Sequence, residues 1–122
     1  MDLKNQTQKR TIKFRIFNKK IKSYIDIHSS AIMIDELNNL NDNLIVEQFT
    51  GLHDKNGKEI FEGEILYNND RKENCVVKYD EEKAMFIVEY LESKDKFNLW
   101  ESISNLYYSV GNIHENPELL TD

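Results

Sequence analysis

The stretch QFTGLHDKNGKEIFEGEIL (residues 48–66) contains three of the four glycines in this chain of 122 residues. These glycines recur every six residues, at Gly51, Gly57 and Gly63. Glycine lets a chain turn sharply at little steric cost. A second stretch, GNIHENPEL (111–119), holds the fourth glycine and the only proline. The turn chemistry is therefore concentrated in two places, and we expect the fold to be fixed there.

The turn residues of these stretches have specific signatures. The dipeptide Asn56-Gly57 predicts a tight hairpin turn, because both residues tolerate positive φ, and Asp54 can brace that turn through the backbone. Gly63 predicts a bulge or a sharp bend, and Gly111 a bend in the closing strand. The predicted structural turn residues are Gly51, Asn56, Gly57, Gly63, Gly111 and Pro117.

Short strand patterns surround the two stretches. Apolar and polar side chains alternate in 11–17 (TIKFRIF) and in 21–27 (IKSYIDI), which predicts an N-terminal hairpin. Residues 29–43 fit a helical stripe only roughly, so they predict a short helix or an irregular crossover. From residue 44 onward, strand patterns recur about every 8–12 residues, a spacing typical of a small barrel or a curled sheet.

The predicted fold class is therefore mainly β, or β-rich α+β. A flexible tail (1–11) precedes an N-terminal hairpin and crossover subdomain (12–43), and a barrel-like subdomain (44–122) follows. The segment IFEGEIL (60–66), with two hairpin-like strands after it, favours an SH3-like antiparallel barrel. A chain of this length is one domain or two small subdomains sharing a core, so we expect one cooperative unit.

Three blocks resemble a known family. They are KFRIFNKK (13–20), QFTGLHDKNGKEIFEGEIL (48–66) and VGNIHENPELL (110–120), and in this order they resemble the YopX family of small proteins, encoded mostly by bacteriophages and prophages. The blocks cover under a third of the chain. The chain departs from the family pattern at His53, where lysine is common, and at Phe61, where tyrosine is common. The resemblance implies a mostly β fold that can form oligomers, and it brings no established activity.

Composition narrows the class of protein. With 39% hydrophobic residues the chain can bury a core, and no apolar run approaches the roughly 18 residues that span a bilayer. The start of the chain lacks the apolar stretch of a secretory signal. We therefore expect a protein of the bacterial cytoplasm without a membrane partner. The single cysteine, Cys75, excludes an internal disulfide and is interpreted as a strand residue.

Charge is distributed unevenly along the chain. Residues 1–30 carry eight Lys or Arg against two acids, a net charge of +6, whereas residues 31–122 carry eight against twenty, a net charge of −12. A basic hairpin could lie against an acidic body, within one chain or between copies. It could instead bind nucleic acid, although the acidic body would repel phosphate. The candidate nucleic-acid-binding residues are Arg10, Lys13, Arg15, Lys19, Lys20 and Lys22.

Candidate catalytic and metal residues are few. The histidines, His28, His53 and His114, show no metal-binding spacing, so we interpret them as surface or turn residues. His53 and His114 are weak metal candidates, because the two family-like blocks could pack together. Glu62 and Glu64 flank Gly63, where a structural role is favoured over catalysis. No phosphate-binding or nucleophile motif occurs, so no catalytic residue or cofactor is predicted.

Together these observations predict a non-catalytic phage accessory protein that binds a host or phage protein, including copies of itself. Binding of nucleic acid through the basic N-terminal hairpin is the alternative. An acidic body that mimics DNA is a third hypothesis and ranks below both, because a net charge of −12 over residues 31–122 is modest for that role. An enzyme ranks last, because no motif supports one.

Overall fold

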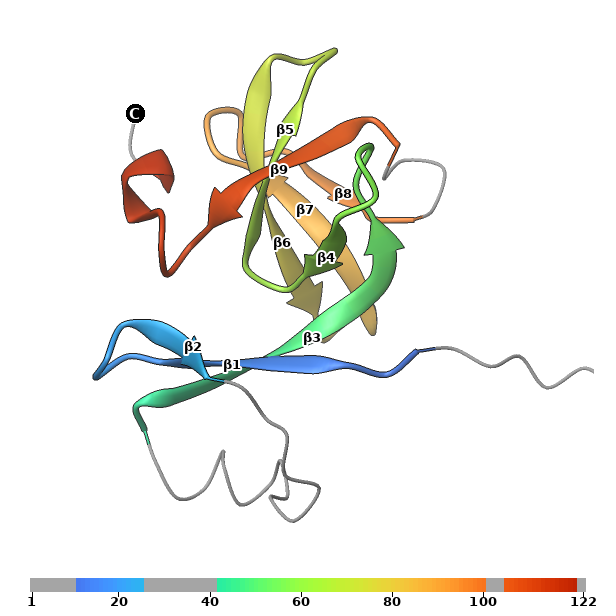
Figure 1. Ribbon diagram of the computed structural model, residues 1–122. Helices are drawn as coiled ribbons and strands as arrows, with labels where there is room; N and C mark the ends of the chain where they lie inside the picture. Colours follow the sequence, from blue (N-terminus) through green and yellow to red (C-terminus); the bar gives the residue numbers. More distant parts are fainter. Residues whose placement is uncertain (1–10, 26–41, 101–104, 121–122) are drawn as a thin grey trace, which may run out of the picture.

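Nine short strands make up most of the part of the chain that the computed structural model describes, residues 11–25, 42–100 and 105–120 (Figure 1). The strands are β1 (Phe14–Asn18), β2 (Ser23–Ile25), β3 (Leu44–His53), β4 (Glu59–Phe61), β5 (Glu64–Asn68), β6 (Glu73–Asp80), β7 (Met85–Tyr90), β8 (Lys96–Asn98) and β9 (Tyr107–Asn112). A 3-10 helix, η2 (Pro117–Leu120), follows them.

The strands form two antiparallel sheets. The first has the order β2-β1-β3-β4, and the second has the order β8-β7-β6-β5-β9. The second sheet is strongly curled, and the β1–β2 hairpin lies beneath it in Figure 1. The predictions of a mainly β fold, an N-terminal hairpin and a curled, barrel-like sheet are confirmed. The helix or crossover predicted for 29–43, apart from its last two residues, and nearly all of the predicted tail lie outside the described residues.

Strand β3 is the longest strand of the first sheet and pairs with a different strand along each half of its length. Its first half pairs with β1, where Arg15 lies opposite Glu47, and its second half pairs with β4. The register shifts between Phe49 and His53, and Gly51 adopts a φ of 87° within this interval. The prediction that Gly51 makes a turn was therefore wrong, because Gly51 bends β3 as a bulge and the strand continues past it. This bend lies in the half of β3 that pairs with β4, beyond the half that pairs with β1.

The loop between β3 and β4 depends on Asp54, as its position before Asn56-Gly57 predicts. The Asp54 Oδ1 accepts hydrogen bonds from the backbone N–H groups of Asn56 and Lys58, each at 2.9 Å. Its Oδ2 accepts a third, from Ser109 of β9, also at 2.9 Å. Of the Asn56-Gly57 pair only Gly57 has positive φ, at 85°, so the turn is not the predicted type with two such residues. The side chain of Asp54 sets its shape and ties it to β9.

Three other hairpin turns share a pattern of side-chain hydrogen bonds to the backbone that was not predicted from the sequence. Asn18, Asn68 and Asp80 each end a strand, and the side-chain Oδ1 of each accepts hydrogen bonds from the backbone N–H groups two and three residues further on. Four residues after each of these comes a residue in the left-handed region. These residues are Lys22, Lys72 and Ala84, with φ of 55°, 56° and 54°. The hydrogen bonds from the Asn and Asp side chains stabilise these turns, so the left-handed position does not need glycine.

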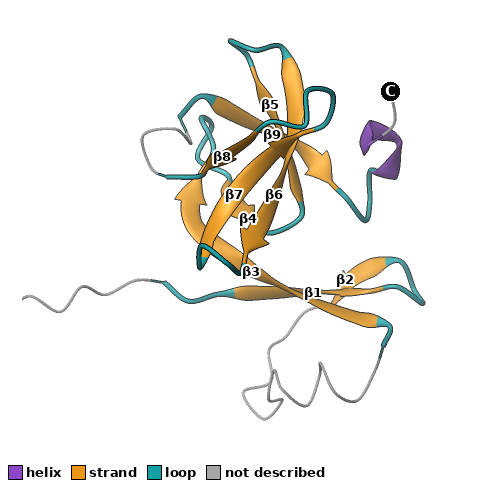
Figure 2. Ribbon diagram, turned by 180° about the vertical axis from the view of Figure 1, so that it is seen from behind, coloured by secondary structure: helices purple, strands orange, loops and turns teal. Residues whose placement is uncertain are grey.

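The C-terminal block closes the curled sheet. Strand β9 pairs with β5, and the register is irregular between Ile65 and Leu66, opposite Gly111. A Cβ at Gly111 would lie 2.5 Å from Oδ1 of Asn116, so a side chain there would clash. Pro117, one of the predicted turn residues, begins the 3-10 helix η2, which follows the end of β9 (Figure 2). Within the described ranges, no helix is long and apolar enough to cross a membrane.

The hydrophobic core gathers side chains from β4 to β9. Two of its members are tyrosines, and the Oη atoms of Tyr90 and Tyr107 lie 2.9 Å apart. Asn68 donates a hydrogen bond to Tyr90 Oη at 2.7 Å, so these buried polar groups are satisfied. Burial raises the pKa of the Cys75 thiol to about 12, which agrees with its interpretation as an inert strand residue. The core residues are Ile60, Leu66, Cys75, Val77, Val88, Tyr90, Leu99 and Tyr107.

We expect the variant Ala84→Gly to be more stable than the wild type by about 0.5–1 kcal/mol. Left-handed φ costs a residue with a Cβ about 1–2 kcal/mol, and the greater flexibility of unfolded glycine offsets part of the gain. Urea unfolding monitored by Trp100 fluorescence measures the difference. The matched control is Lys83→Gly, because its neighbour Lys83 lacks positive φ and should lose stability on the same change. Equal effects of the two changes would contradict the assignment of strain to residue 84.

Candidate functional site

Arg15 is the centre of a cluster of charged side chains between the two sheets. From β1, its Nε donates to Oε1 of Glu47 at 2.9 Å and its Nη1 donates to Oε1 of Glu64 at 2.7 Å. Its Nη2 donates to the backbone oxygen of Glu62 at 3.0 Å. The side chain of Glu47 is 5% exposed and that of Glu64 is 1% exposed. One guanidinium therefore neutralises two buried carboxylates on different strands.

Glu47 has two further partners on its other side. Tyr24 of β2 donates from its Oη to Oε1 of Glu47 at 2.8 Å, and burial raises the pKa of this phenol, which stays a neutral donor. The Nε2 of His114 lies 3.1 Å from Oε2 of Glu47, and the His114 ring stacks on Phe17 with centroids 4.5 Å apart. The name Arg15 cluster is used below for Arg15, Tyr24, Glu47, Glu64 and His114.

Glu64 extends the cluster to β9 and to the β3–β4 loop. Ser109 donates from its Oγ to Oε2 of Glu64 at 2.7 Å, and the Nζ of Lys58 lies 3.9 Å from the same oxygen. Every buried side-chain nitrogen or oxygen of the described residues has a hydrogen-bond partner. A catalytic carboxylate needs an oxygen free to meet a substrate. The geometry of this cluster is that of a structural junction between strands.

Gly63 makes room for this junction. Its φ is 82°, and a Cβ at this position would collide with Oε2 of Glu47. Next to it, Oε1 of Glu62 accepts a hydrogen bond from the backbone N–H of Gln48 at 2.8 Å, and burial raises the pKa of the Glu62 carboxyl. Both acids that flank Gly63 thus contact their own chain, in line with the structural role that the sequence favours.

The two candidate metal ligands lie in separate places. His114 contacts Glu47, whereas His53 lies at the far end of β3 with its ring beside Phe49. His53 is six positions beyond Glu47 along β3, a distance of about 20 Å in an extended chain. Among the described residues, no group of three His, Cys, Asp or Glu could hold a metal ion. His28 lies outside these residues.

The basic residues of the N-terminal hairpin divide into two sets. Lys13 pairs with Glu59 at 2.9 Å, and Arg15 belongs to the cluster, so part of the basic hairpin lies against acids of its own chain. The other set is exposed at the β1–β2 turn and makes no ion pair within the described part of the chain. This set is Lys19, Lys20 and Lys22. The remaining candidate, Arg10, lies outside the described residues.

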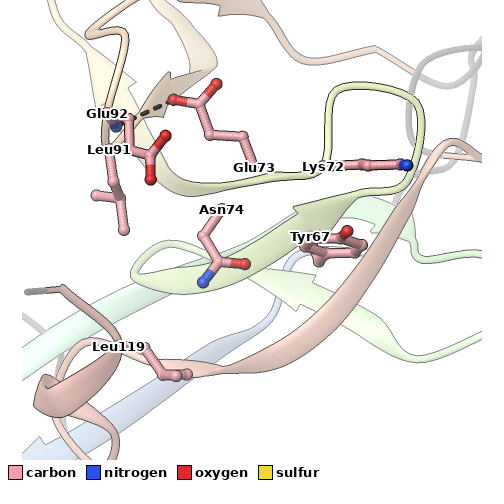
Figure 3. Close-up of a pocket in the computed structure, with 7 residues that line it drawn as sticks. All are labelled: Tyr67, Lys72, Glu73, Asn74, Leu91, Glu92 and Leu119. Carbon is pink, nitrogen blue, oxygen red and sulfur yellow. Dashed lines mark hydrogen bonds between the residues drawn. The ribbon is translucent and has the colours of Figure 1, made fainter. Parts of the chain in front are cut away.

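A polar hollow of about 240 Å³ lies between the β5–β6 hairpin and η2 (Figure 3). Glu73 at its rim accepts hydrogen bonds from the backbone N–H groups of Ser93 and Glu92, which lower the pKa of its carboxyl. Lys72 points away from Glu73 in Figure 3. The ammonium group of Lys72 and the carboxylate of Glu73 therefore do not meet in this hollow.

A second, more apolar hollow of about 200 Å³ lies where β5 and β7 end and β9 begins. Phe97 and Leu106, which are 46% and 44% exposed, are part of its lining. Arg71 lies over the ring of Tyr90, with its Cζ 4.0 Å from the ring centroid, and donates to Oδ2 of Asp95 at 2.8 Å. The name Phe97 hollow is used below for the lining residues, which are Asn68, Arg71, Tyr90, Phe97, Leu106 and Tyr107.

Sequence reasoning missed the Phe97 hollow. Exposed aromatic residues are typical of a protein contact, but a linear pattern does not show which aromatic residues are exposed. Trp100 is 55% exposed, whereas Tyr108 is only partly exposed. Nothing in the sequence around Phe97 or Leu106 distinguishes these two residues from core residues.

Comparisons with known proteins give a family and a solved structure. The family model described as YopX protein matches residues 3–121. The crystal structure of protein EF1440 from Enterococcus faecalis is similar, with 26% sequence identity and a TM-score of 0.65. The similarity covers 93% of this chain and 100% of that one. The comparison with curated proteins gives no match.

We expect Arg15→Ala to lower the free energy of unfolding by about 3–5 kcal/mol, because it leaves two buried carboxylates without their counter-charge. Chemical denaturation measures the loss. The control is Lys13→Ala, which removes an exposed ion pair from the same strand and should cost less than about 1 kcal/mol. Similar losses in the two variants would show that the Arg15 cluster is not a special source of stability.

Asp54 gives a pH dependence with a defined sign. Burial alone would raise the pKa of its carboxyl, but the hydrogen bonds from the backbone N–H groups of Ser109, Lys58 and Asn56 outweigh burial and lower it. The ionised form therefore stabilises the fold above the unfolded pKa of about 3.9, and this stabilisation is lost as pH falls through the folded value.

We expect Asp54→Asn to be about 1–3 kcal/mol less stable than the wild type at pH 7, because an amide NH₂ would face the N–H of Ser109. This difference should narrow below about pH 4, where the wild type loses its own carboxylate. Urea unfolding at a series of pH values measures both. The control is Asp70→Asn, at an exposed turn position. A difference between wild type and Asp54→Asn that stays constant down to pH 2 would contradict the role of the ionised group.

Proposed function

Because the chain belongs to the YopX family, we propose that it is a non-catalytic accessory protein of a bacteriophage or prophage, and that it binds other proteins in the cytoplasm of a bacterial host. The Phe97 hollow carries this proposal. Two large apolar side chains, Phe97 and Leu106, are exposed side by side at one concave site. Exposed apolar groups that converge on a hollow are typical of a surface that a partner covers.

The chemistry of the Phe97 hollow fits a protein partner. Aromatic residues and arginine are enriched in the centres of protein interfaces, and this hollow contains Tyr90, Phe97, Tyr107 and Arg71. The guanidinium of Arg71 is held in place by Asp95 and by the tyrosine ring beneath it. A side chain that is already ordered loses little conformational freedom when a partner binds.

The size of the hollow indicates what it would take. A volume of about 200 Å³ holds one side chain of the size of leucine, isoleucine or phenylalanine. Burying such a side chain contributes about 1.5–3 kcal/mol, which is enough for one anchor residue within a larger contact surface. A host protein, a phage protein or another copy of this chain could supply it.

A non-catalytic role has separate support in the Arg15 cluster. The carboxylates of Glu47 and Glu64 are occupied by hydrogen bonds to Arg15, Tyr24, Ser109 and His114. Their hydrogen bonds hold strands of the two sheets together. Chemistry on a substrate would require breaking them.

We expect the double variant Phe97→Ser/Leu106→Ser to lose a partner that the wild type captures. The tagged proteins are incubated with lysate of the bacterial host, with and without nuclease treatment, and stoichiometric partners are identified by mass spectrometry. The matched control is Ile12→Ser/Val110→Ser, which removes two exposed apolar side chains away from the hollow. Unfolding curves verify that both variants fold.

The proposal fails if wild type and the Phe97→Ser/Leu106→Ser variant capture the same partners in the same amounts. It also fails if the captured partners disappear on nuclease treatment, because binding would then depend on nucleic acid. If both double variants lose the partner, the loss follows from any exposed apolar-to-polar change. That result would also overturn the assignment of partner binding to the Phe97 hollow.

A further inference from the structure

We propose that the tip of the β1–β2 hairpin of one copy docks into an acidic hollow on a second copy of this chain. The hairpin tip is Lys19, Lys20, Ile21 and Lys22. The acidic hollow lies at the β6–β7 turn and includes Tyr79, Asp80, Glu81, Glu82, Ile87 and Glu89. This contact rests on the proposed protein-binding role but uses surfaces separate from the Phe97 hollow.

The hairpin tip is an exposed and ordered knob. Ile21 is 60% exposed between lysines, and within the described residues none of the three lysines has an ion-pair partner. Asn18 Oδ1 accepts hydrogen bonds from the N–H groups of Lys20 and Ile21, at 2.9 and 3.4 Å. The N–H of Lys19 donates to the backbone oxygen of Asn43 at 2.7 Å. The tip is therefore shaped before it meets a partner.

The composition of the tip indicates its partner. The three lysines supply a charge of +3 around Ile21, an apolar side chain that is 60% exposed. A complementary surface must combine an apolar floor with an acidic rim. Burying Ile21 on such a floor would favour the contact, while the charges would set its orientation and its dependence on salt.

The acidic hollow has both an apolar and an acidic part. It has a volume of about 390 Å³, and its apolar lining residues are Tyr79, which is 43% exposed, and the largely buried Ile87. On its rim, Glu81 and Glu82 are exposed and make no ion pair within the described part of the chain. The Oδ1 of Asp80 is engaged in the β6–β7 turn.

Two lysines also line the acidic hollow, and their charge must be included. Lys78 and Lys96 lie 3.1 and 3.9 Å from the same oxygen of Glu89. Four carboxylates and two ammonium groups leave the hollow with a net charge of −2, which opposes the +3 of the tip. Because Lys78 and Lys96 both pair with Glu89, we expect the lysines of the tip to be attracted mainly to Glu81 and Glu82 at the rim.

The occupant is a second copy because the knob and the hollow are distinct surfaces of one chain. Within the described residues, no ion pair joins the tip to the hollow of the same chain. A contact between two different surfaces is heterologous, so repeating it builds a ring or an open chain of copies. Nucleic acid is the competing occupant of the tip, but the net charge of −6 on the whole chain opposes its approach.

A charge-swap experiment tests this contact. The tip variant is Lys19→Glu/Lys20→Glu/Lys22→Glu, and the hollow variant is Glu81→Lys/Glu82→Lys. In sedimentation at about 50 mM salt, where charges act over longer distances, the wild-type mass should rise above the 14.5 kDa of one chain as concentration increases. Each variant alone should remain at 14.5 kDa. A 1:1 mixture should associate again, because each acidic surface then meets a basic one.

Two controls separate this contact from other effects. The variant Lys55→Glu/Lys72→Glu/Lys94→Glu has the same net charge as the tip variant and should associate like the wild type. The Phe97→Ser/Leu106→Ser variant should also keep its self-association, whereas the tip variant should keep the partner bound at the Phe97 hollow. Failure of one proposal is thereby distinguished from failure of the other.

Three outcomes would overturn the proposal. The first is a wild-type mass of 14.5 kDa at every concentration. The second is a variant mixture that stays dissociated while the wild type associates. The third is binding of a 20-base-pair DNA duplex that the tip variant loses and the hollow variant keeps, without self-association. In that case log K should fall with log salt with a slope of about −3, near −0.9 for each lysine, and the tip would be a nucleic-acid contact.

Discussion

The pairing of one arginine with two buried carboxylates is the constraint on which the rest of the structure depends. Arg15 lies on β1, Glu47 on β3 and Glu64 on β5, so the three charges join strands from both sheets. Two carboxylates that share a site with little water repel each other unless a cation lies between them. The N-terminal hairpin is therefore required to balance charge inside the molecule, and Gly63 must lack a side chain so that Glu47 can occupy its place.

The strands were largely predictable from the sequence, whereas the turns were predictable only in part. Alternation of apolar and polar residues directly predicts a half-buried strand. The position of Asp54 before Asn56-Gly57 predicts the turn that its side chain stabilises. The left-handed residues of the other hairpin turns were not predicted, because glycine was taken as the marker of that conformation. Here Asn18 and its counterparts hold such conformations with lysine or alanine, and Gly51 marks a bulge within a strand.

The site residues were less predictable because they depend on contacts between distant parts of the chain. The charge asymmetry correctly suggested a basic hairpin against acids, but it could not select Glu47, which lies 32 residues from Arg15. It also could not separate the paired Lys13 from the unpaired lysines of the turn. The exposure of Phe97 follows from the position of β8 at the edge of its sheet, and an edge strand is not visible in a linear pattern.

The pairing of β3 with both β1 and β4 has a consequence for how the molecule unfolds. Its backbone hydrogen bonds to β1 and β4 lie on one continuous segment, Leu44–His53, and its side chain Glu47 reaches β5 through Arg15. If β3 leaves the N-terminal sheet, the charge balance beneath β5 is lost as well. Amide protons of the first sheet and of β5 should then exchange with solvent through the same opening event, because the Glu47–Arg15–Glu64 link couples β3 of the first sheet to β5 of the second.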